Sequence, residues 1–163
     1  EETREGHRRQ IKEIEPVRDY LGAFFYDQNK GPHIILRVAR IVECAKRLGV
    51  KVGELWDIVL IHEFAHLIHL SEDDSDGLFS TRHDSGFAEL TAQLITWKVV
   101  KNTQMQPVFE KLSTHQSPKY QAWESIKDIS LEEFRGFLSF LRKHNIPSNY
   151  EAAKSKYPIL PAI

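Results

Sequence analysis

Residues 60–69 read L-I-H-E-F-A-H-L-I-H, and they contain the pattern H-E-x-x-H at His62, Glu63 and His66. On an α-helix, positions i and i+4 lie on one face, so the two imidazoles can bind the same metal ion. Glu63 follows His62 directly, where its carboxylate can reach a water molecule bound to that ion. Apolar residues flank the motif on both sides, which predicts a helix that runs through a core. Because a core does not normally bury two imidazoles and a carboxylate without partners, the pattern predicts a metal site in the middle of the fold.

The rest of the chain predicts a predominantly helical α+β fold. Two stretches rich in aromatic or β-branched residues, 20–26 and 33–37, flank turn-forming residues and predict a β-hairpin. We expect this small antiparallel hairpin to pack on the H-E-x-x-H helix. Apolar residues at helical spacing predict helices at 38–48, 54–69, 85–100, 107–114, 118–127 and 131–144. The strongly charged residues 1–15 predict a short helix or a flexible arm, and three prolines punctuate a tail in which we expect little chemistry.

Composition narrows the class of protein. The chain has 163 residues, which is most simply one domain, 1–163. Its formal net charge of -1 gives no electrostatic reason to expect binding to nucleic acid or to an anionic membrane. Its single cysteine, Cys44, lies on a predicted apolar helix face and is expected to be a buried thiol. We find neither a long apolar run nor a signal-peptide pattern, so a cytoplasmic location is the default expectation. The first residue is not methionine, so we expect either a trimmed chain or one domain of a longer protein.

Two histidines leave a catalytic zinc ion in need of a third protein ligand. A metzincin would have a histidine at position 72, where this chain has Glu72, so that pattern is excluded. His69 lies one turn past His66 and is expected at the rim of the site or in a supporting position. We favour Glu89, on the next predicted helix, as the third ligand, with His83 as the alternative. The remaining candidates are acidic: Asp73, Asp74 and Asp76.

A supporting residue follows the favoured ligand. Gln93 comes one turn after Glu89 on the same face, and its amide oxygen could accept the ring N–H of a ligating histidine. The order H-E-x-x-H, then Glu89-x-x-x-Gln93, resembles the gluzincin peptidases, although thermolysin-type gluzincins have an aspartate where Gln93 stands. The region 20–127 is also similar in its order of elements to small bacterial H-E-x-x-H metallopeptidase-like domains. This resemblance implies a minimal zincin-like domain with Zn²⁺ as cofactor.

The expected activity is hydrolysis of peptide bonds in a protein or peptide substrate. Glu63 would act as general base on a zinc-activated water. Tyr120 is the first candidate donor to the developing oxyanion, and His115 the second. An extended substrate would lie along the strand at residues 33–36.

Two alternatives remain. One is a catalytically silent zinc-binding module that acts through interaction, with other domains of a parent chain as candidate partners; the intact Glu63 argues against it. The other is a SprT-like, DNA-associated protease with His83 as third ligand, and the near-neutral charge argues against that.

Overall fold

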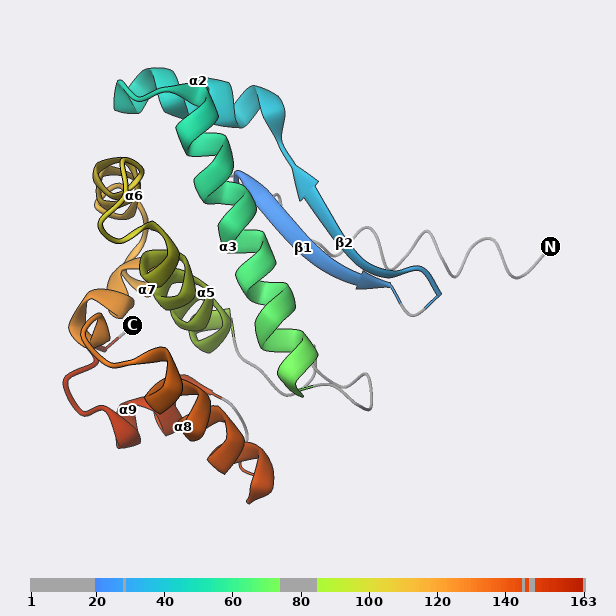
Figure 1. Cartoon of the computed structure of the whole chain (residues 1–163), viewed down its shortest axis with the longest axis vertical. Coiled ribbons are helices and arrows are strands. Elements are labelled where there is room, and N and C mark those ends of the chain that lie inside the picture. The colour runs from blue at the N-terminus through green and yellow to red at the C-terminus, as the bar shows by residue number, and fades with distance from the viewer. Residues whose placement is uncertain (1–19, 28, 74–84, 145, 147–148, 163) are drawn as a thin grey trace.

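The long helix α3 (Val52–Asp73) lies at the centre of the arrangement, and the hairpin and the following helix pack against it (Figure 1). This computed structural model describes residues 20–27, 29–73, 85–144, 146 and 149–162. Leu55, Ile58, Val59 and Ala65 of α3 are buried. A helix that is apolar on most of its sides is stable where neighbours cover it all round. The sequence prediction of a core helix at 54–69 is confirmed, and the helix extends a few residues further at each end.

The two strands form the predicted hairpin on one side of α3. Strand β1 (Gly22–Asp27) pairs antiparallel with β2 (Gly31–Leu36), with Phe24 opposite Ile34. Gly31 has a φ of 78°, a left-handed conformation that glycine adopts at little cost and that suits the start of the second strand. Both strands contact α3. The described residues therefore form a mostly helical α+β fold with a small antiparallel sheet on the H-E-x-x-H helix, as predicted.

Helix α2 (Val38–Leu48) joins the hairpin to α3. Its C-cap, Gly49, has a φ of 65°, and its N–H donates to the carbonyls of Ala45 and Lys46. This left-handed cap is the helix stop that the sequence predicts. Cys44 is buried on the apolar face of α2, as expected.

The second half of the described chain is helical. Helix α5 (Ser85–Val100) packs along α3, and α6 (Gln106–Ser113) contacts both. The predicted helix at 118–127 is a short α-helix, α7 (Pro118–Gln121), followed by a 3-10 turn, η1 (Ala122–Ile126). Together with α5 and α6 they enclose an aromatic cluster of Trp97, Phe109 and Trp123, in which Trp97 stacks on Phe109.

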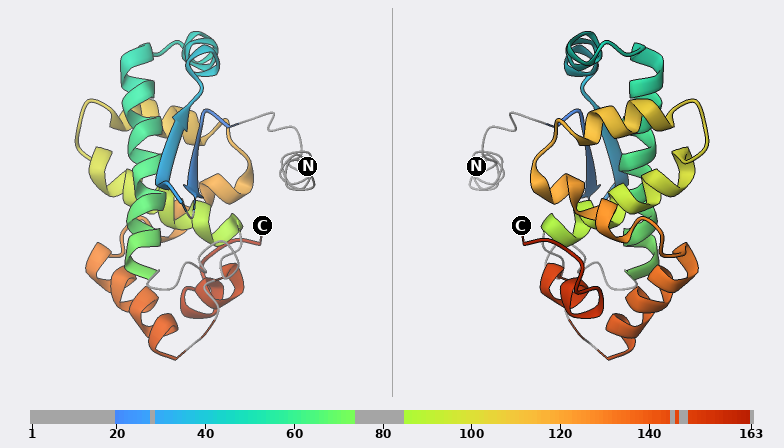
Figure 2. Two further views of the ribbon diagram at one scale, coloured as in Figure 1. Left: turned by 90° about the vertical axis from the view of Figure 1, so that its right-hand side faces the viewer. Right: turned by 90° about the vertical axis from the view of Figure 1, so that its left-hand side faces the viewer.

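The last two helices form the end of the molecule farthest from α2 (Figures 1 and 2). Helix α8 (Leu131–Lys143) was predicted, whereas α9 (Tyr150–Lys156) was not. The Asn149 side chain accepts a hydrogen bond of 2.8 Å from the Ala152 N–H and caps α9. The prolines around this segment suggested an irregular tail, but the ten residues between Pro147 and Pro158 leave room for a helix of seven residues, which makes about two turns.

Among the described residues, none of the helices combines the length and the apolar character that crossing a bilayer requires. The predicted arm at residues 1–15 lies outside the described part of the chain.

Candidate metal centre

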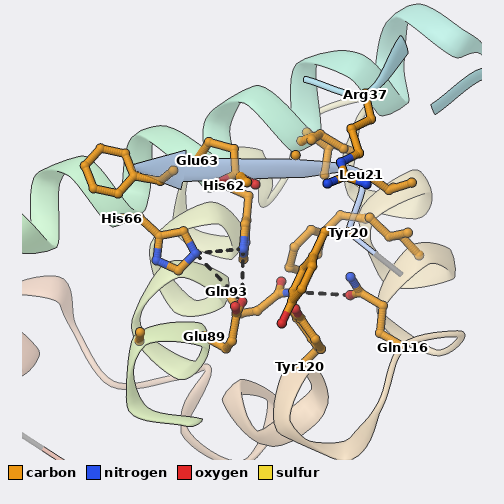
Figure 3. A pocket seen from close by; sticks show the side chains of 18 of the residues that line it. Tyr20, Leu21, Arg37, His62, Glu63, His66, Glu89, Gln93, Gln116 and Tyr120 are labelled. Atoms are coloured by element: carbon orange, nitrogen blue, oxygen red, sulfur yellow. Dashed lines mark hydrogen bonds and ion pairs between the residues drawn. The ribbon is translucent and has the colours of Figure 1, made fainter. Parts of the chain in front are cut away.

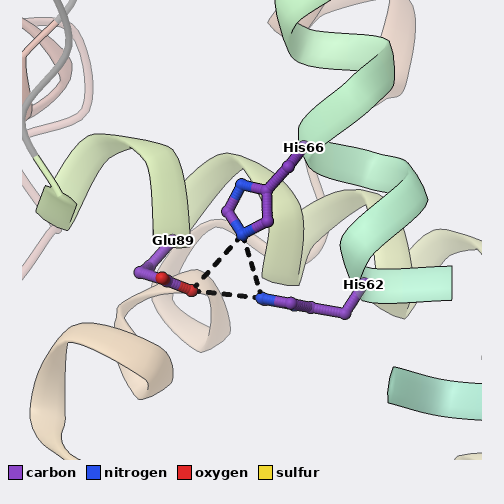
Figure 4. A group of neighbouring side chains, drawn as sticks. All are labelled: His62, His66 and Glu89. Carbon is purple, nitrogen blue, oxygen red and sulfur yellow. Dashed lines mark hydrogen bonds and ion pairs between the residues drawn. The ribbon is translucent and has the colours of Figure 1, made fainter. Parts of the chain in front are cut away.

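Three side chains from two helices converge at one point between α3 and α5 (Figure 4). His62 and His66 project from the same face of α3, one turn apart, and Glu89 reaches them from α5. His62 Nε2 lies 3.1 Å from Glu89 Oε2 and 3.2 Å from His66 Nε2. The separation between His66 Nε2 and Glu89 Oε2 is 3.8 Å. The structure therefore brings together the two motif histidines and the favoured third ligand.

The arrangement fits a metal ion. Metal–nitrogen and metal–oxygen bonds of about 2.0–2.2 Å in a tetrahedron place neighbouring ligand atoms about 3.3–3.6 Å apart, close to the separations found here. The side chains are 14%, 12% and 12% exposed for His62, His66 and Glu89, so one side of the cluster is open to solvent. A neutral imidazole carries one N–H, which cannot point along two directions at once. A cation between three lone pairs satisfies all three atoms, and these residues can therefore hold a metal ion.

Burial and charge set the protonation of the two histidines differently. Burial, and then the charge of His62, lower the pKa of His66 to about 4. His66 is therefore neutral at physiological pH, the form that binds metals. Burial also acts to lower the pKa of His62, but the hydrogen bond to Glu89 and the charges of Glu89 and Glu63 outweigh it and raise that pKa. The metal-free cluster thus holds its proton on the His62–Glu89 pair.

Glu63 lies beside the cluster but is not one of its three converging groups. Its side chain is buried, with 5% relative exposure. Burial raises the pKa of Glu63 to about 7, the charge of His62 opposes this shift, and the charge of Glu89 adds to it. Strand β1 approaches Glu63 very closely, because a Cβ added to Gly22 would lie 2.6 Å from Glu63 Oε1. Glycine at position 22 is what allows the strand to pack directly over this carboxylate.

A cavity of about 370 Å³ opens beside the cluster (Figure 3). This volume falls within the range of about 300–1,000 Å³ that is typical of small-molecule sites. Its apolar lining comes mainly from β1, α3 and α6, and includes Leu21, Ile58, Phe109 and Leu112. Its polar lining consists of the cluster, Glu63, and Tyr20, Arg37, Gln93, Gln116 and Tyr120.

Two tyrosines lie on the wall of the cavity opposite α3. The ring of Tyr120 is 6.3 Å from that of His62, centroid to centroid. Burial raises the pKa of the Tyr120 hydroxyl, and the charges of Glu89 and Tyr20 and hydrogen bonds to both add to this shift. Tyr120 therefore stays protonated and can donate. Sequence reasoning singled out Tyr120 but treated Tyr20 simply as part of a strand; its place before the glycine that lies over Glu63 becomes informative once the hairpin is seen to pack on α3.

The prediction for Gln93 was wrong in its partner. Gln93 lines the cavity one turn beyond Glu89, but its Nε2 donates to Gln116 Oε1 at 3.1 Å. Its Oε1 is buried without a hydrogen-bond partner, so the expected bond to a histidine ring is not formed. The physical reason is that Gln116, on the connection between α6 and α7, accepts a hydrogen bond from the amide of Gln93 and sets its orientation.

His115 does not join the site. It is exposed, its Nδ1 lies 2.8 Å from the Lys111 carbonyl oxygen, and it lines a neighbouring cavity with Arg40 and Arg47. His69 is buried, with its ring 5.6 Å from that of Phe87, so it lies in the core and not at the rim. Residues 74–84, which include His83, Asp74 and Asp76, lie outside the described chain, as does the side chain of Asp73.

The strand beside the cavity is β1 and not the predicted stretch 33–36. Residues 21–25 line the cavity, whereas the described residues of β2 do not. The reason is that β1, and not β2, packs over Glu63, through Gly22. The expectation of an extended ligand along a sheet edge therefore transfers to β1.

Comparisons with protein-family models, with curated proteins and with solved structures found no match to this chain. The case for a function therefore comes from the residues of the site and their geometry.

Proposed function

We propose that this protein is a zinc-dependent peptidase. The observation that carries the proposal is the convergence of His62, His66 and Glu89 within 4.8 Å, beside a buried Glu63 that is not itself one of the ligands. A metal site that served structure alone would need no second carboxylate held next to it. The first three residues supply the ligands, and the fourth supplies a base.

Zinc is the metal that suits this donor set best. Two neutral imidazoles and one carboxylate are a common combination in catalytic zinc sites, which keep a further position open for water. When bound, zinc would lower the pKa of a water molecule towards neutrality and polarise a carbonyl oxygen. The partial exposure of the three ligands leaves room for that water on the cavity side.

The chain's own residues have distinct roles in the proposed reaction. Glu63 takes a proton from the attacking water and later passes it to the leaving amine. Gly22 and the backbone of β1 hold the Glu63 carboxylate in place from above. Tyr120 keeps its proton and is positioned to donate to the substrate carbonyl oxygen as negative charge develops there.

An extended peptide fits beside β1. The backbone of residues 21–25 lines the cavity, and a strand that faces a cavity can pair with a peptide through its N–H and C=O groups. Such pairing would fix the peptide bond above Glu63 and the metal ligands. The substrate class is therefore a protein segment or peptide bound in extended form.

The test uses purified protein loaded with zinc. We expect one zinc ion per chain and cleavage of peptides from a mixed library, detected by mass spectrometry. Glu63→Gln should retain the zinc and lower the rate by at least about 100-fold, since proton transfer by a positioned base contributes roughly 10²–10⁴-fold. His115→Ala is the matched control and should retain both. Zinc bound without any cleavage by the natural sequence would instead support a silent metal-binding module.

A further inference from the structure

Gln93 has a hydrogen-bonding group that the fold leaves unused. Its side chain is 2% exposed, and its Oε1 is buried without a hydrogen-bond partner. Leaving an amide oxygen in this state is costly, and most buried polar atoms in folded proteins are paired. Gln93 also lines the cavity of the metal cluster, where a ligand can approach it. The unpaired atom therefore points to a ligand that brings a donor.

The partner of Gln93 is held firmly in place. Gln116 lies between α6 and α7, and its side-chain oxygen accepts the 3.1 Å hydrogen bond from Gln93 Nε2. The backbone of Gln116 is fixed twice, because its N–H donates to the Ser113 carbonyl at 3.1 Å and its carbonyl accepts a 2.7 Å bond from Gln121 Nε2. Figure 3 shows the two amides facing each other across the end of the cavity. They form a rigid pair that we call the amide pair, Gln93 and Gln116.

The amide pair always leaves one oxygen over as an acceptor. With Gln93 Nε2 bonded to Gln116 Oε1, the groups left over are the Gln93 oxygen, the second N–H of Gln93 and the N–H groups of Gln116. If both amides are turned over, the oxygen left over is that of Gln116, and N–H groups of both residues are again free. A carboxylate brings no donor for this oxygen, and turning only one amide over would set two oxygens or two nitrogens against each other and break the bond within the pair.

Apolar side chains lie on the same side of the metal ligands as the amide pair, in a cavity that Tyr20, Arg37 and Tyr120 also line. Ile58 precedes His62 by one turn on α3, and Gln93 follows Glu89 by one turn on α5. Because the two helices run antiparallel, with His69 against Phe87 and His62 against Glu89, Ile58 and Gln93 lie on the same side of the metal ligands. Phe109 and Leu112 line the same cavity from α6. The end of the cavity thus combines apolar walls with a polar pair at its base.

We propose that the amide pair recognises a primary carboxamide, and that the substrate has glutamine or asparagine beside the scissile bond. A carboxamide presents one N–H₂ donor and one C=O acceptor, the complement of what the pair leaves over. A methylene stem would pack against the apolar walls. A small rotation about the terminal torsion of Gln93, which is a soft torsion, turns its oxygen towards the incoming donor. This inference rests on the proposed peptidase function and adds the substrate class to it.

The experiment compares peptides that are identical except at the two positions flanking the bond. Each position carries glutamine, asparagine, glutamate or methionine in turn, and kcat/KM is measured with the zinc-loaded protein. At one of the two positions, we expect the peptide with the preferred amide, glutamine or asparagine, to have a kcat/KM ~10–100-fold above those of the glutamate and methionine peptides. The glutamine and asparagine arms identify which stem length fits. Gln93→Leu should bring the ratio of amide to methionine close to one, whereas Gln104→Leu, which changes an exposed glutamine, should leave the ratio unchanged.

The outcomes separate this inference from the proposed function. Peptides cleaved without preference for an amide would overturn the recognition of carboxamides and leave the peptidase proposal standing. If none of the peptides is cleaved, the peptidase proposal fails, and the amide pair is tested by binding alone. The side-chain amide resonances of Gln93 and Gln116 are then followed by ¹⁵N NMR during titration with capped glutamine, glutamate and norleucine. Shifts with capped glutamine and not with the other two support the inference, and equal or absent shifts overturn it.

Discussion

The two helix pairs α3–α5 and α8–α9 bury side chains of opposite kinds. The α8–α9 pair is joined by an aromatic cluster, in which the ring of Phe134 lies 6.2 Å from that of Phe137, also on α8, and 6.4 Å from that of Tyr157, the residue that follows α9. The α3–α5 pair is surrounded by apolar residues as well, but at its centre it buries imidazoles and carboxylates. In α8 the apolar residues follow one face of an amphipathic helix, with exposed residues such as Glu132 on the other.

This difference separates residues that explain the fold from residues that need another explanation. Burial of an aromatic side chain stabilises a domain, so the α8–α9 cluster is accounted for by packing. Burial of a carboxylate such as Glu63 or Glu89 costs free energy, and replacing buried ionic groups by apolar ones is often neutral or stabilising. The polar centre of α3–α5 therefore indicates a function, and it should respond to mutation differently from α8–α9.

The largest change in stability is expected in the α8–α9 pair. Phe134 is 1% exposed, and Phe134→Ala leaves a cavity that the surrounding helices cannot fully close. We expect the free energy of unfolding to fall by about 3–5 kcal/mol, measured by urea denaturation of the metal-free protein. Zinc affinity of the fraction that remains folded should stay within a few-fold of the natural protein, because the proposed metal ligands come from α3 and α5. A large loss of affinity would show that the two helix pairs are coupled.

The converse change removes a proposed metal ligand from the α3–α5 pair. Glu89→Gln keeps the shape of the side chain but replaces the carboxylate with a neutral amide, and zinc affinity should fall by at least about 100-fold. Its effect on the stability of the metal-free protein should be far smaller than that of Phe134→Ala, because His62 can release its proton once the carboxylate is gone. Isothermal titration with zinc and urea denaturation measure the two quantities on the same sample. Unchanged zinc affinity would remove Glu89 from the ligand set and return attention to residues 74–84.

The proposed metal ligands and most helices could be predicted from the sequence, but the contacts around the site could not. Spacing of i and i+4 on a core helix is enough to place His62 and His66 together, and a carboxylate on the neighbouring helix is enough to nominate Glu89. The identity of the strand above the site was not predictable, because the choice between β1 and β2 depends on the close contact between Gly22 and Glu63. The partner of Gln93 was not predictable either, because Gln116 approaches it from a connection after α6. Helix α9 was missed because a seven-residue helix between prolines has too short an apolar pattern to stand out.

A pH-dependent effect should distinguish the buried Glu63 from an exposed glutamate on α8. The pKa of Glu63 is raised from its usual 4.5 to about 7 in the metal-free fold. Between these pH values the folded protein keeps a proton that the unfolded chain has released, so this group makes stability fall as pH rises from 4.5 to 7. His66, with a pKa lowered to about 4, acts in the opposite direction, since its contribution is lost as pH falls from 6.5 to 4. Glu63→Gln removes the first effect and keeps the second.

We therefore compare the free energy of unfolding of Glu63→Gln with that of the natural protein at pH 5 and at pH 8. The value for the variant minus that for the natural protein should be roughly 2 kcal/mol larger at pH 8 than at pH 5. Urea denaturation of the metal-free proteins at the two pH values measures this difference. Glu132→Gln on α8 is the control and should show no such gain, because Glu132 is exposed. An equal response of the two variants would mean that the Glu63 carboxyl is not held in a buried environment.

The smallest effects come from one chemical change, glycine to alanine, made in each region. At Gly22 an added Cβ would lie 2.6 Å from Glu63 Oε1 and 2.9 Å from Val59 Cγ1, whereas at Gly136 on α8 the described structure has nothing within 4 Å. Gly22→Ala should therefore destabilise the protein by about 1–3 kcal/mol through overpacking. Gly136→Ala should stabilise it by about 0.5–1 kcal/mol, because alanine loses less conformational freedom in a helix. Opposite signs of the two changes in the free energy of unfolding would show that β1 packs directly on Glu63, the proposed base. A stabilising Gly22→Ala would mean that the strand lies farther from Glu63 and that α3 alone holds this side chain.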